Sequence, residues 1–122
     1  MPAHKILVVD DSPTERYFLA DLLTKKGYKV ITAENGQEAM AKVKVERPAV
    51  VVLDVVMPGQ NGFQVTRALS RDPETQAIPI IICTSKGNET DRIWGLRQGA
   101  REYLVKPVKP EELLARVADL AH

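Results

Sequence analysis

The strongest constraint on the fold is a fivefold alternation of short apolar runs with stretches of helical spacing. The runs are rich in β-branched residues and lie at 6–9, 30–33, 49–53, 78–83 and 103–105. Most of them do not alternate between apolar and polar residues, which is typical of parallel strands covered on both faces. Strands that alternate strictly with helices predict an α/β protein, with a parallel sheet between two layers of helices.

The stretches between the runs carry helix signals at their ends. Ser12 precedes Pro13 and lies three residues before Glu15, so we expect a helix to begin after Ser12 and to end at Gly27. Its apolar side is predicted to contain Phe18, Leu19, Leu22 and Leu23. Four more helices are expected to begin near Asn35, after Asn61, near Glu89 and at Pro110. Gly95 should weaken the fourth helix, predicted over 89–98, by about 1 kcal/mol relative to alanine.

Length and composition exclude several classes of protein. The 122 residues fit one domain, which we expect to span 1–122. Seventeen Lys and Arg against sixteen Asp and Glu leave a net charge of +1, which argues against a dedicated nucleic-acid binder. The single cysteine, Cys83, permits no internal disulfide and is expected to be an inert core thiol. With no secretory or transmembrane segment evident, we expect a soluble, cytoplasmic monomer that binds neither nucleic acid nor membranes.

Polar residues follow the predicted strands at their carboxyl ends, where parallel α/β sheets bind ligands. Asp10 and Asp11 follow the first run, Asp54 follows the third, and Lys106 follows the fifth. Thr84 comes directly after the fourth run. If the first and third strands are neighbours, three carboxylates, one hydroxyl and one ammonium group meet at one edge of the sheet.

Such a cluster of carboxylates is costly without a counter-charge. Two like charges about 4 Å apart repel by about 4 kcal/mol at an effective dielectric constant near 20. Either one carboxylate stays protonated or a divalent cation binds, and an oxygen-only ligand set suits Mg²⁺ better than zinc. For any one of these aspartates alone, a solvated residue at a strand end would be the simpler interpretation.

Four sequence motifs occur in a specific order: Val8-Val9-Asp10-Asp11-Ser12, Leu53-Asp54-Val55-Val56-Met57-Pro58-Gly59, Ile82-Cys83-Thr84-Ser85 and Tyr103-Leu104-Val105-Lys106-Pro107. With these motifs, the chain resembles the receiver domain of two-component response regulators over essentially its whole length. The resemblance implies a flavodoxin-like (βα)5 doubly wound parallel sheet with strand order 2-1-3-4-5. It also implies a cis peptide bond between Lys106 and Pro107.

The resemblance implies roles for the acidic residues. Asp54 would be the phosphoacceptor, attacking a phosphohistidine of a histidine kinase or a small donor such as acetyl phosphate. Asp11, Asp54 and the main-chain carbonyl of Val56 would bind Mg²⁺ directly, and Asp10 would act largely through water. Val56 and Lys86 occupy positions that tune acyl-phosphate hydrolysis in the family. An apolar Val56 cannot orient the attacking water, but the polar Lys86 leaves the lifetime of the acyl phosphate open.

The resemblance further implies a phosphate-driven switch. Lys106 would pair with one phosphoryl oxygen and the Thr84 hydroxyl with another, and Tyr103 would turn into the space that Thr84 leaves. The face formed by the fourth helix, the fifth strand and the fifth helix would then change. Tyr103 could instead be an ordinary half-buried strand residue, and Trp94 could simply pack on the domain. The predicted output surface contains Trp94, Arg97 and Arg101.

Local strings, above all the segment 89–104, resemble the PilH-type receivers, which are stand-alone regulators in chemosensory systems that control type IV pili and twitching motility. The expected partners are therefore a histidine kinase and a downstream motility or signalling protein, although the chain could instead drain phosphate from the kinase. A Mg²⁺-dependent aspartyl phosphohydrolase is a weaker alternative, because such enzymes usually need a second acid where this chain has Val56. A scaffold without phosphorylation is disfavoured by the intact motifs.

Overall fold

The computed structural model describes residues 4–57, 59 and 61–121, which form one five-stranded parallel sheet and five helices. The strands are β1 (Lys5–Val9), β2 (Lys29–Ala33), β3 (Val50–Leu53), β4 (Ile80–Thr84) and β5 (Glu102–Val105). The helices are α1 (Pro13–Lys25), α2 (Gly36–Glu46), α3 (Gly62–Arg71), α4 (Glu89–Arg97) and α5 (Pro110–Leu120). The strand order is β2-β1-β3-β4-β5, and this confirms the order that the family resemblance implied.

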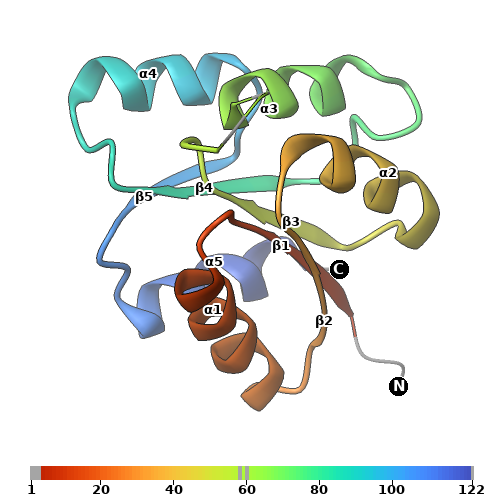
Figure 1. The fold of residues 1–122 in the computed structure, drawn as a ribbon, viewed down its shortest axis with the longest axis vertical. Coiled ribbons are helices and arrows are strands. Elements are labelled where there is room, and N and C mark those ends of the chain that lie inside the picture. The colour runs from red at the N-terminus through yellow and green to blue at the C-terminus, as the bar shows by residue number, and fades with distance from the viewer. Residues whose placement is uncertain (1–3, 58, 60, 122) are drawn as a thin grey trace.

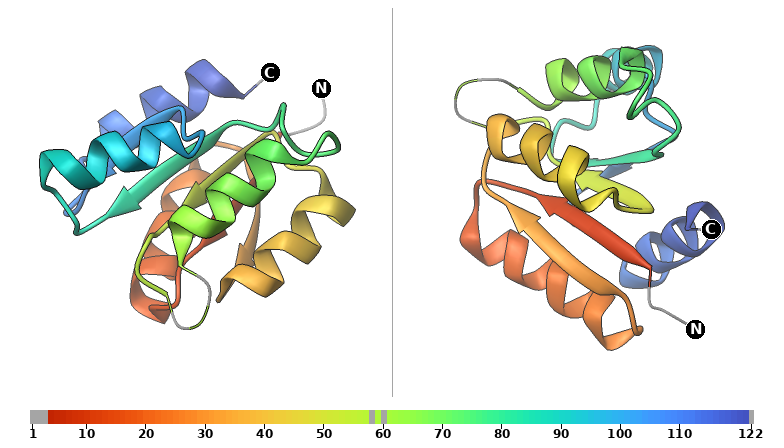
Figure 2. Two further views of the ribbon diagram at one scale, coloured as in Figure 1. Left: turned by 90° about the horizontal axis from the view of Figure 1, so that it is seen from above. Right: turned by 90° about the vertical axis from the view of Figure 1, so that its right-hand side faces the viewer.

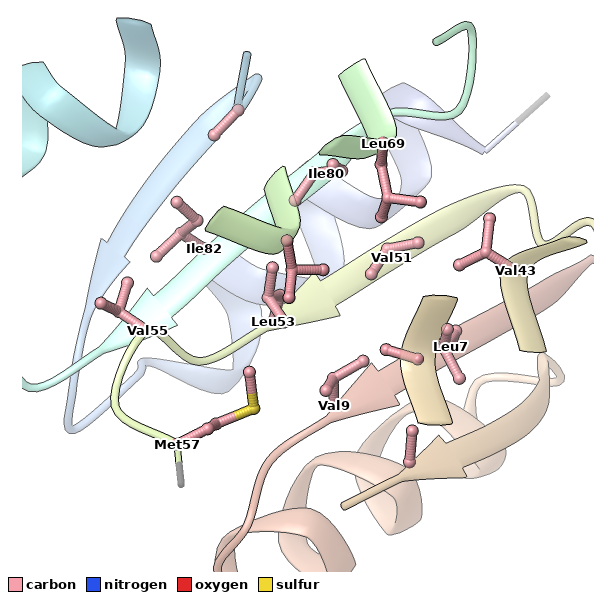
Figure 3. Packing of buried hydrophobic residues seen from close by; sticks show 14 residues of the cluster. Leu7, Val9, Val43, Val51, Leu53, Val55, Met57, Leu69, Ile80 and Ile82 are labelled. Atoms are coloured by element: carbon pink, nitrogen blue, oxygen red, sulfur yellow. The ribbon is translucent and has the colours of Figure 1, made fainter. Parts of the chain in front are cut away.

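Helices cover both faces of the sheet. α1 and α5 lie on one face, and α2, α3 and α4 lie on the other (Figures 1 and 2). Side chains that alternate along each strand pack against the two layers in turn, and fully burying one leucine or isoleucine contributes about 1.5–3 kcal/mol. Figure 3 shows the cluster beneath α2 and α3, which includes Leu7, Val51, Leu53, Ile80 and Ile82. The cluster beneath α1 and α5 includes Ile6, Val8, Val52, Ile81 and Cys83.

Two details of the sequence prediction were wrong. β4 begins at Ile80 rather than at residue 78, because the Ile78 N–H donates to the Thr75 carbonyl at 3.0 Å and Pro79 has no N–H. Phe18 does not join the apolar side of α1, and 45% of its surface is exposed. It lies beside the segment between β5 and α5, where it lines a shallow hollow with Pro107.

The helix starts follow from side-chain caps. The side chains of Ser12, Asn35, Asn61 and Asn88 each accept a hydrogen bond from a main-chain N–H three residues later. These bonds satisfy N–H groups that the helix itself leaves without partners. The cap of α1 holds the short loop that carries the residues at the carboxyl end of β1.

Gly95 does not prevent α4 from forming, and its position explains why glycine is suited to it. A Cβ atom on Gly95 would lie 2.9 Å from Cδ2 of Tyr103 and 3.1 Å from Cδ1 of Ile82. The missing side chain therefore lets α4 approach β4 and β5 closely.

The peptide bond between Lys106 and Pro107 is cis, as the resemblance implied. Among the described residues, no helix combines the length and apolar character needed to span a membrane.

Candidate functional site

The predicted carboxylate cluster requires the first and third strands to be neighbours, and β1 and β3 are adjacent in the sheet. Val9 pairs with Leu53 in the ladder, so Asp10 and Asp54 leave neighbouring strands at the same level. The Asp54 N–H donates to the Val9 carbonyl at 3.0 Å, which holds the two strand ends together just before the acidic residues.

The three predicted metal-binding aspartates do come together. One carboxylate oxygen from each of Asp10, Asp11 and Asp54 lies within 4.8 Å of the others. Asp10 and Asp54 are only 1% and 8% exposed, whereas Asp11 is open to solvent. Hard carboxylate oxygens with one side open to water are the ligand set that Mg²⁺ prefers. The residues present therefore fit a magnesium ion.

Asp10 is held at both carboxylate oxygens. Its Oδ1 accepts a hydrogen bond from the Ser12 N–H at 3.0 Å, and its Oδ2 accepts one from Lys106 Nζ at 2.8 Å. Its main-chain carbonyl accepts a third hydrogen bond, from Nη1 of Arg16 at 2.8 Å. An almost fully buried carboxylate needs such partners, since burying a charge without them is costly.

Asp54 is oriented by the chain that follows it and by the same lysine. Its Oδ1 accepts from the N–H groups of Val55 at 2.6 Å and Val56 at 3.2 Å. Its Oδ2 accepts from Lys106 Nζ at 3.0 Å. Lys106 thus bridges Asp10 and Asp54, and its Nζ lies 3.9 Å from the carboxylate of Glu15. Burial alone would lower the pKa of Lys106, but the hydrogen bonds to Asp10 and Asp54 outweigh burial and raise it.

Thr84 and Tyr103 lie on neighbouring strands and meet at the same loop. The hydroxyl oxygen of Thr84 accepts a hydrogen bond from the Lys86 N–H at 3.3 Å. The hydroxyl of Tyr103 donates to the Lys86 carbonyl at 2.7 Å. Burial raises the pKa of the Tyr103 phenol to about 12, with smaller contributions from the negative charges of Asp91 and Asp54.

The structure brings together only two of the three predicted output residues. Trp94 and Arg97 line one shallow hollow of about 280 Å³ on α4, and Trp94 is 48% exposed. Arg101 lies beyond the end of α4 and beside the start of β4, because its N–H donates to the carbonyl of Ile80, the first residue of β4. It lines a separate hollow there, together with Lys5 and Arg47.

Sequence reasoning missed one residue that touches the site, Arg16. Arg16 binds a main-chain carbonyl, and every residue has one, so the sequence does not show which residue is its partner. The only signal is the position of Arg16, one turn into the helix that follows Asp10 and Asp11.

The aspartate cluster and its bridging lysine lie at the carboxyl ends of the strands, where doubly wound α/β sheets bind their ligands. The family model for the response regulator receiver domain matches residues 6–118. The chain belongs to that family, and its architecture is the flavodoxin-like receiver fold.

Individual proteins agree with this assignment. The chain is 57% identical to Protein PilH of Pseudomonas aeruginosa over 113 residues, which is 93% of each chain. The chemotaxis protein CheY4 of Vibrio cholerae has a similar structure, with a TM-score of 0.90, 34% identity and coverage of 98% and 99% of the two chains. The receiver domain of the sensor histidine kinase PA1611 from P. aeruginosa, solved with a magnesium ion in its active-site cleft, has a TM-score of 0.90, 27% identity and 98% coverage of both chains. Other curated relatives are longer, and the chain spans about half of their length or less.

Proposed function

We propose that residues 1–122 form a single receiver domain that acts as a stand-alone response regulator, phosphorylated on Asp54 by a histidine kinase in a Mg²⁺-dependent reaction. Receiver domains accept phosphoryl groups from histidine kinases. The observation that carries the proposal is the position of the Asp54 carboxylate, held between Lys106 and the two acidic residues that follow β1.

In the proposed reaction, Oδ2 of Asp54 attacks the phosphorus atom of the donor. The new O–P bond forms as the bond from phosphorus to the donor nitrogen breaks, and the imidazole nitrogen keeps that electron pair. The N–H groups of Val55 and Val56 hold Oδ1 and so orient the attacking oxygen. Lys106 is already at Oδ2 and can follow the transferred group as a point charge.

Magnesium would be held by Asp10, Asp11, Asp54 and the main-chain carbonyl of Val56. When bound, it supplies positive charge that offsets the carboxylates and stabilises the transition state of phosphoryl transfer. The Thr84 hydroxyl, at the end of the neighbouring strand, would donate to another phosphoryl oxygen. Thr84 is fully buried, and its hydroxyl would reach that oxygen by a rotation of its side chain.

Output is proposed to pass through Thr84 and Tyr103 to α4. If Thr84 turns toward the phosphoryl group, its contact with Lys86 is lost, and Tyr103 is bonded to the same residue. Phosphorylation then shifts the population of two arrangements of this loop. Trp94 and Arg97 on α4, with Arg101 beyond the end of that helix, are the proposed contact residues for a downstream protein.

The similarity to Protein PilH supports a role in a chemosensory system that controls type IV pili and twitching motility. The chain would act there as a cytoplasmic monomer through protein contact, and it would catalyse no reaction of an external substrate. A phosphate sink that drains the kinase is the second candidate, since it needs the same site without the output surface.

The test is the intact mass of the protein after incubation with acetyl phosphate, with and without Mg²⁺. We expect an added mass of one phosphoryl group in the parent protein, lost when EDTA removes the metal. The matched control is Asp54→Asn, which keeps the shape of the side chain and should gain no mass. A parent protein that stays unmodified, also with a competent histidine kinase, would refute the proposal.

A further inference from the structure

Arg16 reaches from α1 to the peptide between the two N-terminal acidic residues of the site. Its Nη1 donates a hydrogen bond of 2.8 Å to the carbonyl of Asp10, and its side chain is only 16% exposed. A hydrogen bond from a charged donor is stronger than a neutral one, so this contact holds the carbonyl firmly.

The other end of the guanidinium group is anchored outside the site. Nη2 of Arg16 lies 3.3 Å from Oε1 of Glu34, the residue that follows β2. The Glu34 N–H donates to Glu38, which is itself paired with Lys42 at 2.8 Å. Arg16 therefore connects the loop after β1 to the loop after β2 and, through it, to the first turns of α2.

This connection has a geometric consequence for Asp10 and Asp11. Successive side chains of an extended chain point to opposite faces, yet here both carboxylates approach Asp54 to within 4.8 Å. The chain must turn at the peptide that joins them, and the orientation of that peptide is what Arg16 fixes through the Asp10 carbonyl.

We propose that Arg16 is a positioning residue for the metal site: it holds the Asp10–Asp11 peptide in the orientation that aims both carboxylates at the cation. The inference rests on the proposed function for the identity of that cation as Mg²⁺. Arg16 touches neither the carboxylate oxygens nor any reacting atom, so it acts through the backbone alone.

The charge of Arg16 and its positioning role predict opposite changes in the affinity for Mg²⁺ when Arg16 is replaced. Arg16 is a positive charge close to a cation site, so charge alone predicts that Arg16→Met strengthens Mg²⁺ binding. Positioning predicts that the same substitution weakens binding, because partners behind the metal ligands typically change affinity by about 10- to 100-fold. The direction of the change therefore separates the two effects.

The experiment is isothermal titration calorimetry with MgCl₂ on the parent protein, Arg16→Met, Arg16→Lys and Glu34→Gln. We expect Arg16→Met to weaken Mg²⁺ binding by about 10-fold, with partial recovery in Arg16→Lys, which can still donate to the Asp10 carbonyl. Glu34→Gln should have a smaller effect in the same direction. Arg92→Met is the matched control, because Arg92 pairs with Glu89 at 3.1 Å on α4 and should leave binding unchanged.

Urea unfolding of each variant without Mg²⁺ checks that the titrated protein is folded. Unchanged or tighter Mg²⁺ binding by folded Arg16→Met would overturn the positioning role and leave the proposed function intact. A parent protein that binds no Mg²⁺ would overturn the proposed function itself, and the inference with it.

Discussion

The hydroxyl of Tyr103 on β5 donates a hydrogen bond of 2.7 Å to the main-chain carbonyl of Lys86, two residues after Thr84. The Lys86 N–H donates to Thr84 in turn, so one residue of the loop is bonded to both proposed switch residues. The loop that follows β4 is therefore connected to both side chains through Lys86.

Replacing Tyr103 with phenylalanine should destabilise the protein slightly. Tyr103→Phe removes the hydroxyl and leaves the Lys86 carbonyl without this donor, which costs about 1 kcal/mol for a typical hydrogen bond. The free energy of unfolding in urea measures the change. Tyr17→Phe is the control, because Tyr17 is 74% exposed, and its stability should stay within about 0.5 kcal/mol of the parent. Equal changes in the free energy of unfolding of the two variants would show that the hydrogen bond to Lys86 contributes nothing to stability.

Removing the charge of Lys106 should make stability depend on Mg²⁺. Lys106→Met leaves Asp10 and Asp54 without their shared cation, and we expect a loss of about 3–5 kcal/mol without metal. Added Mg²⁺ should recover much of that loss, because it supplies the missing positive charge and binds only the folded state. Urea unfolding across a Mg²⁺ series gives the measurement.

The control for Lys106 is Lys25→Met, because Lys25 forms an exposed ion pair with Asp21 at 3.0 Å on α1. Such a pair contributes about 0.3–0.5 kcal/mol, independent of Mg²⁺. A deficit in Lys106→Met that stays constant as Mg²⁺ rises would contradict this account of the site.

The thiol of Cys83 should resist alkylation in the folded protein. Burial raises its pKa from 9.0 to about 12, so the reactive thiolate is scarce even in mildly alkaline buffer. Iodoacetamide at pH 9 should label the urea-unfolded protein quickly and the native protein only as fast as it opens. Mass spectrometry measures the extent of labelling over time. Rapid labelling of the native protein would instead favour a redox-sensitive cysteine.

The exposed tryptophan of α4 should matter for output and not for phosphorylation. Trp94→Ala removes a large exposed side chain of the kind that dominates protein contacts. We expect unchanged phosphorylation by acetyl phosphate and a loss of complementation in a twitching assay with a strain that lacks its own PilH-type receiver. Tyr17→Ala, an exposed aromatic residue on α1, is the control. Full complementation by Trp94→Ala would assign Trp94 to packing alone and favour the phosphate sink.

Much of the fold could be predicted from the sequence because every strand is a short apolar run and most helix starts carry a cap. The order of the strands could not be predicted from the pattern alone, since an apolar run does not specify its neighbour in the sheet. The resemblance supplied that order. The pattern also failed where local chemistry overrides hydrophobicity, as at Ile78, which is held in a turn before Pro79.

The residue pattern shows where side chains act in the site but not where the main chain acts, and the expectation for the Val56 carbonyl came from the family resemblance alone. Asp10, Asp11 and Asp54 could be placed because they follow neighbouring strands. The N–H groups of Val55 and Val56 carry no residue signature, and neither does the carbonyl that Arg16 holds. Arg101 follows α4 in the sequence, but it lines a hollow with Lys5 and Arg47 rather than the hollow that Trp94 lines.

The most direct test of the central claim is to locate the phosphoryl group within the chain. After treatment with acetyl phosphate and Mg²⁺, borohydride reduction converts an aspartyl phosphate to homoserine, and peptide mass mapping shows where. We predict homoserine in the position of Asp54, dependent on Mg²⁺ and with no such product in Asp54→Asn. Homoserine at another position, with Asp54 unmodified, would contradict the account.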